Sequence, residues 1–146
     1  METSGERAGA NPSLWERTAQ KFFTSPLGGH ITGEVCVIGA GIAGVITAYL
    51  AARENRQVIL IDDGPVGGGM TGRTTAHIVN AIDDRYLDLE KFLGEECARL
   101  TAESHTAAID CAERIVGEQK IGCDFERLDG YLFLPPGGSV KELMEE

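Results

Sequence analysis

The sequence predicts an α/β fold with a parallel sheet, and three successive stretches predict it. Residues 34–39 form a short apolar run that ends in glycine, which is typical of a strand buried on both faces. Residues 42–54 favour a helix, and residues 57–61 return to an apolar strand. Strand, helix and strand fit within about 30 residues, the length of one right-handed βαβ unit.

The segments around this unit predict less regular structure. Residues 1–30 indicate a mobile tail followed by an arm that packs by its aromatic residues, Phe22 and Phe23 among them. Asn55 predicts a left-handed stop after the helix. Residues 62–72 hold too many glycines for regular structure and predict a loop.

The second half of the chain predicts a long helix and then a new domain. Small or apolar residues recur at helical spacing and predict a stripe that faces a core: Cys97, Leu100, Ser104, Ala108, Cys111 and Ile115. Residues 122–134 predict two strands joined by a tight turn at Asp129 and Gly130, and another helix begins at Ser139. We therefore expect a tail and arm over residues 1–30, a nucleotide-binding domain over 31–122, and the start of a second, α+β domain over 123–146 in a truncated chain.

Composition bounds the class of protein. The chain has 146 residues and a net charge of -10, and residues 83–146 hold sixteen acids against seven bases. Because phosphate backbones are bound by clustered lysine and arginine, we expect no nucleic-acid partner. The four cysteines show no ligand spacing, so no metal site is predicted. No apolar run is long enough to span a membrane, and we predict a cytoplasmic protein.

A G-x-G-x-x-G motif, the first glycine loop (residues 39–44), lies between the first strand and the first helix. In this context Gly39 permits a tight turn, Gly41 lets the backbone approach a pyrophosphate, and Gly44 lets the helix pack on the strand. The N-H groups and partial positive charge of the helix N-terminus, at Ile42 and Ala43, favour phosphate. The motif therefore predicts a dinucleotide site.

Two acids refine this prediction. Asp62 ends the second strand, where a carboxylate accepts hydrogen bonds from an adenosine ribose. Asp62 and Asp63 together would repel a 2'-phosphate, so NADP is disfavoured and NAD or FAD is left. The alternative interpretation of the same residues is a tight strand-to-helix turn beside a solvated acid.

A second glycine loop (residues 67–76), followed by His77, reads Gly-Gly-Gly-Met-Thr-Gly-Arg-Thr-Thr-Ala. An NAD-binding domain has little use for such a loop here, and the two glycine loops together resemble FAD-dependent oxidoreductases of the D-amino-acid-oxidase (DAO) type. Residues 71–78, preceded by Ser-Leu-Trp-Glu at 13–16, are similar to the subset of that family with a C-terminal Rieske iron-sulfur domain. The resemblance runs from about Pro12 to the end of the chain.

The resemblance implies roles for particular residues. The glycines of the first loop would hold the pyrophosphate, Asp62 the adenosine ribose, and residues 71–76 the flavin-side half of FAD. Arg73 would add charge to a phosphate, the alternative being an exposed loop arginine. The implied cofactor-binding set is Gly39, Gly41, Ile42, Ala43, Gly44, Asp62, Asp63, Thr71, Gly72, Arg73, Thr74, Thr75 and Ala76.

The resemblance also implies a reaction. Some relatives bind flavin covalently through a histidine in this loop; Ala76 occupies that position here, which implies non-covalent FAD. A small amine, amino acid or related substrate would be oxidised by hydride transfer to flavin, with electrons passing to an acceptor. Catalytic residues, and any Rieske 2Fe-2S cluster, would belong to a missing C-terminal part, so this fragment is expected to be inactive alone. An NAD-binding or non-catalytic nucleotide-binding module is the alternative.

Overall fold

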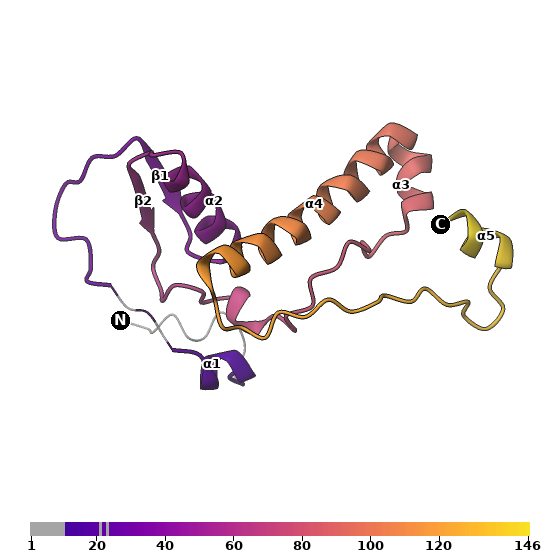
Figure 1. The fold of residues 1–146 in the computed structure, drawn as a ribbon, viewed down its shortest axis with the longest axis horizontal. Helices are drawn as coiled ribbons and strands as arrows, with labels where there is room; N and C mark the ends of the chain where they lie inside the picture. Colours follow the sequence, from indigo (N-terminus) through magenta and orange to yellow (C-terminus); the bar gives the residue numbers. More distant parts are fainter. Residues whose placement is uncertain (1–10, 21, 23) are drawn as a thin grey trace. The chain divides into compact units, whose positions relative to one another are not determined.

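The structure, a computed structural model, describes residues 11–20, 22 and 24–146, which form parts of two compact units, Met1–Ala76 and His77–Glu146. The predicted mobile tail at residues 1–10, and Phe23 of the predicted arm, lie outside the described residues. The boundary between the units falls inside the predicted nucleotide-binding domain, whose limits stay a prediction. The elements, shown in Figure 1, are α1 (Leu14–Thr18), β1 (Val35–Ile38), α2 (Ile42–Arg53), β2 (Val58–Ile61), η2 (Thr71–Arg73), α3 (Tyr86–Leu93), α4 (Glu95–Gln119) and α5 (Val140–Glu145).

The predicted βαβ unit is confirmed in the first unit. β1 and β2 pair in parallel, with Val35 opposite Val58 and Ile38 opposite Ile61, and α2 connects them (Figure 1). Side chains alternate across a strand, and in β1 Val35 and Val37 are half-buried while Cys36 and Ile38 are exposed. The prediction that β1 is buried on both faces is therefore wrong, because only one face of this two-stranded sheet is covered.

The interior of the chain is small. Among the described residues, those that are buried are Ala40, Ala48 and Ala98, at 2%, 9% and 6% exposure. Many large apolar side chains are exposed, including Ile38 at 82%. The helices of the described part of the chain include none that is both long and apolar enough to cross a membrane.

Asn55 ends the first helix as predicted, with φ of 60° directly after Glu54, the C-cap residue of α2. Left-handed backbone is unfavourable by about 1–2 kcal/mol for most L-residues, and asparagine and glycine tolerate it best. We expect Asn55→Ala to lower the free energy of unfolding by about 1 kcal/mol and Asn55→Gly to leave it unchanged or raise it slightly. Urea titrations of the two variants check this, and equal stabilities for both would contradict it.

The second unit contains a helix that sequence patterns did not predict. α3 is followed at once by Gly94, whose φ is 88°, and then by α4, against which α3 packs. α4 is the predicted long helix, but four members of its predicted stripe, Cys97, Leu100, Ser104 and Ala108, are exposed. The more covered positions lie one residue further along: Ala98, Thr101, Ala102, Ile109, Ala112 and Val116. Both faces carry small and apolar residues, so the periodicity did not distinguish them.

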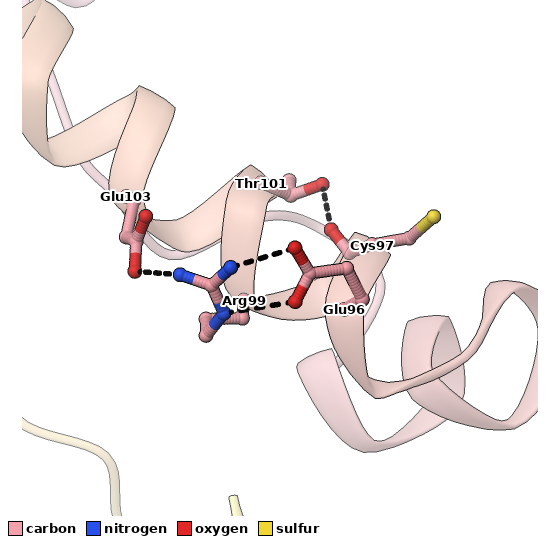
Figure 2. Close-up of polar contacts among 5 residues, drawn as sticks. All are labelled: Glu96, Cys97, Arg99, Thr101 and Glu103. Carbon is pink, nitrogen blue, oxygen red and sulfur yellow. Dashed lines mark hydrogen bonds and ion pairs between the residues drawn. The ribbon is translucent and has the colours of Figure 1, made fainter.

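The acidic residues of α4 lie on its solvated surface, as predicted. Figure 2 shows the Arg99 guanidinium between Glu96 and Glu103, with its nitrogens 2.7 Å and 2.5 Å from the two carboxylates. The hydrogen bond to Glu96, followed by the one to Glu103, raises the pKa of Arg99. All three side chains are about half exposed or more, so these pairs add little to stability.

Residues 122–134 do not form the two predicted strands, nor the turn at Asp129 and Gly130. They are extended, and Figure 1 shows the trace running between α4 and α5 without a neighbouring strand. Strand N-H and C=O groups need a partner strand, and here Arg127 attaches the segment to α4 instead, at 2.5 Å from Asp110 and 2.6 Å from Glu113. α5 begins after Ser139, as predicted.

Candidate cofactor-binding site

The first glycine loop is a turn that requires glycine at two positions. Gly39 has φ of 100°, which L side chains rarely adopt. A Cβ atom added to Gly44 would lie 1.7 Å from the Gly39 carbonyl oxygen, a distance no structure tolerates. α2 therefore begins in direct backbone contact with the turn that ends β1.

The two glycine loops lie side by side. The Gly67 N-H donates to the Ala40 carbonyl oxygen at 2.8 Å, and the Ile42 N-H donates to Thr71 Oγ1 at 2.9 Å. A Cβ atom at Gly41 would lie 3.0 Å from the same Thr71 hydroxyl, so this approach also requires a small residue. Segments that are more than twenty residues apart in the sequence thus form one surface at the N-terminus of α2.

Asp62 joins the end of β2 to this surface. Its carboxylate accepts hydrogen bonds from the Ala40 N-H at 2.5 Å and from the Gly64 N-H at 2.7 Å. The Ala40 N-H, and after it the Gly64 N-H, lowers the pKa of Asp62 below the ordinary value for aspartate. The carboxylate is therefore ionised at neutral pH, and both Asp62 and Asp63 are exposed to solvent.

The loop residues fit a dinucleotide. Gly67 and Gly69 have φ of 74° and 62°, and Cβ atoms added to them or to Gly39 would meet nothing within 4 Å. These glycines therefore face open space beside the N-terminus of α2, where backbone N-H groups and the helix dipole favour a phosphate. The chemistry of the surface, backbone donors with one carboxylate at its edge, suits a pyrophosphate with an adjoining ribose.

The second glycine loop continues through η2 into a strained residue. The Arg73 N-H donates to the Met70 carbonyl oxygen at 3.0 Å, and the Ala76 N-H donates to Thr74 Oγ1 at 3.2 Å. Ala76 has φ of 62°, which is unfavourable by about 1–2 kcal/mol for alanine. Thr74, Thr75 and Ala76 are exposed, so the predicted flavin-side contacts lie on accessible backbone.

Arg73 is directed away from solvent. Its Nη2 lies 3.5 Å from Glu16 Oε1, its Nη1 donates to the Asn11 carbonyl oxygen at 3.0 Å, and its side chain is only 19% exposed. Its Nε is buried and has no hydrogen-bond partner within the described part of the chain. The structure thus places Arg73 against the segment around α1, and its predicted phosphate contact stays a prediction.

Sequence analysis missed the site residues of α1. Ser13 and Glu16 form a capping box: the Ser13 N-H donates to Glu16 Oε2 at 2.8 Å, and the Glu16 N-H donates to Ser13 Oγ at 3.1 Å. Ser13 Oγ also donates to the Gly72 carbonyl oxygen, and the Trp15 indole N-H donates to the Thr74 carbonyl oxygen at 2.8 Å. The Ser-x-x-Glu spacing was the available signal for this helix.

Comparison with known proteins gives one family and three relatives. The model of the family described as FAD dependent oxidoreductase (DAO) matches residues 34–146. A Bacillus subtilis protein whose name describes a Rieske 2Fe-2S iron-sulfur protein, YhfW, is 34% identical over 77% of this chain and 22% of its own length. A Haemophilus influenzae protein named as an oxidoreductase, OrdL, is 30% identical over 79% of this chain and 26% of its own.

The third relative is the gamma-glutamylputrescine oxidoreductase of Escherichia coli, which is 26% identical over 92% of this chain and 31% of its own length. The chain thus spans between about a fifth and a third of the lengths of these relatives. No solved structure matches it significantly.

Proposed function

This chain belongs to the DAO family of FAD-dependent oxidoreductases, and from this premise we propose that its two glycine loops bind FAD non-covalently. Gly39, Gly41 and Gly44 would hold the pyrophosphate at the N-terminus of α2, with the N-H groups of Ile42 and Ala43. Asp62 would accept from the adenosine ribose, beside Asp63. Residues 71–76 would contact the flavin-side half.

The pairing of the two glycine loops carries this proposal. The Gly67 to Ala40 and Ile42 to Thr71 hydrogen bonds place both loops on one open surface. The Asp62 carboxylate reaches the same turn through the Ala40 N-H. A dinucleotide with two phosphates, a ribose at one end and a second half beyond them uses all three features, whereas a bare strand-to-helix turn uses none.

We propose that the substrate is a small amine, an amino acid or a related compound. The name of the Escherichia coli relative indicates an amine substrate for that protein, and this supports the same chemical class here. Bound FAD would accept a hydride, while the protein supplies binding, orientation and electrostatics. We further propose a cytoplasmic location and an electron acceptor that is oxygen or another small oxidant; a Rieske cluster is proposed only for sequence beyond residue 146.

Absorption spectra of the protein, incubated with FAD and then freed of unbound cofactor, test the proposal. We expect flavin bands in the protein fraction, and after acid precipitation we expect them in the supernatant. Ala76 stands where covalent relatives have histidine, so flavin in the pellet would contradict the non-covalent part. Colourless protein after incubation with FAD would contradict FAD binding and favour the NAD-binding or non-catalytic alternative, which a parallel NAD titration by calorimetry would separate.

A further inference from the structure

The segment around α1 contacts three consecutive residues of the second glycine loop. We call these contacts the N-terminal clasp: Asn11, Ser13, Trp15 and Glu16 on one side and Gly72, Arg73 and Thr74 on the other. We infer that the N-terminal clasp positions the second glycine loop for FAD, with Trp15 and Glu16 as positioning residues. This inference rests on the proposed function and adds residues that lie outside both glycine motifs.

Each of the three loop residues is held by a different group. The Gly72 carbonyl accepts from the Ser13 hydroxyl, and the Thr74 carbonyl accepts from the Trp15 indole N-H at 2.8 Å. Between them the Arg73 guanidinium meets the Glu16 carboxylate at 3.5 Å. Both partners of this ion pair are largely covered, at 19% and 26% exposure, so water screens it less than it screens the pairs on α4.

The clasp is itself rigid. Glu16 uses one carboxylate oxygen for the Ser13 N-H and the other for Arg73, so one side chain caps α1 and binds the loop together. Because Ser13 in turn caps the Glu16 N-H, neither residue can turn away without breaking the capping box. A five-residue helix is thereby fixed by the loop it touches, and the loop by the helix.

The clasp also sets the direction of a loop N-H group. The C=O and N-H of one trans peptide unit point in opposite directions. Because the Thr74 carbonyl is held by Trp15, the N-H of Thr75 in the same peptide unit is turned away from α1. Loops are mobile by default, and a donor fixed before binding lowers the entropic cost of association. The clasp therefore preorganises a backbone donor that the flavin-side half of FAD would use.

Trypsin and FAD titration together test this inference on the whole protein. W15F removes the indole donor but keeps an aromatic ring, and E16Q removes the charge that binds Arg73. We expect trypsin to cleave after Arg73 about tenfold faster in each variant without FAD, since the loop is no longer held. We expect the Kd for FAD to rise about three- to tenfold in each, the range of one lost hydrogen bond.

The matched control is R17Q, which changes the charge of the neighbouring residue on α1, where the side chain is exposed. It should cleave and bind FAD as the unaltered protein does. Circular dichroism melting and cleavage inside α4 at Arg114 separate loop release from global unfolding. Unchanged cleavage after Arg73 in both W15F and E16Q, or faster cleavage with an unchanged Kd for FAD, would overturn the inference. An unaltered protein that binds no FAD would instead overturn the proposed function, and the cleavage rates would still decide whether α1 holds the loop.

Discussion

Gly44→Ala is expected to raise the Kd for FAD by about 100-fold or more and to lower the free energy of unfolding by about 3 kcal/mol. The added methyl group would lie 1.7 Å from the Gly39 carbonyl oxygen, which is backbone and cannot rotate aside. α2 would have to move off the turn, and its N-terminus would move away from Thr71 with it. FAD titration followed by absorption, together with urea unfolding, measures both effects.

A glycine elsewhere provides the matched control for this substitution. Gly117 lies inside α4, and a Cβ atom added there would meet nothing within 4 Å. Gly117→Ala is expected to leave the Kd for FAD unchanged and to stabilise the protein by up to about 1 kcal/mol, because alanine favours helix. If the Gly44→Ala variant bound FAD as tightly as the Gly117→Ala variant, the close approach of α2 to the turn would have no role in binding.

Asp62→Asn is expected to raise the Kd for FAD about tenfold and to remove a pH-dependent part of the stability. The N-H groups of Ala40 and Gly64 lower the pKa of Asp62 in the folded protein, so the folded state binds a proton less readily than the unfolded state. The stabilisation is therefore complete above the unfolded value of about 3.9 and is lost as the pH falls through the lowered folded value. Unfolding by urea at pH 7 and pH 3 measures this.

The expected result is a difference between the unaltered protein and D62N that is larger at pH 7 than at pH 3. Asp129→Asn is the control, because Asp129 is an exposed acid outside the glycine loops and gives the same change of charge. It should alter neither the pH dependence nor the Kd for FAD. A D62N protein whose stability falls on acidification as steeply as that of the unaltered protein would show that other groups cause the loss.

The βαβ unit could be predicted because local forces determine it. The apolar runs of β1 and β2, the helix-favouring residues between them and the left-handed stop at Asn55 are each encoded within a few residues. The positions of Gly39 and Gly44 follow from the same turn. Loop glycines, the Asp62 position and the start of α5 after Ser139 were likewise readable from short patterns.

The remaining parts depend on partners that are distant in the sequence. α1 and α3 are short helices, and Trp15 meets Thr74 across 59 residues, which no periodicity reveals. Residues 122–134 alternate as strands do, but a strand forms only beside another strand, and Arg127 binds α4 instead. Arg73 was expected at a phosphate because of its loop, whereas Glu16, far from it in the chain, determines its direction.

The indole of the N-terminal clasp gives the protein a built-in optical reporter. Trp15 is the only tryptophan among the 146 residues, and its N-H is bonded to the second glycine loop. Indole emission depends on hydrogen bonding and is quenched by a nearby absorber in the same wavelength range, as flavin is. The ultraviolet fluorescence of the unlabelled protein therefore reports on one place only, and stopped-flow mixing with FAD would follow loop occupancy in real time without any introduced dye.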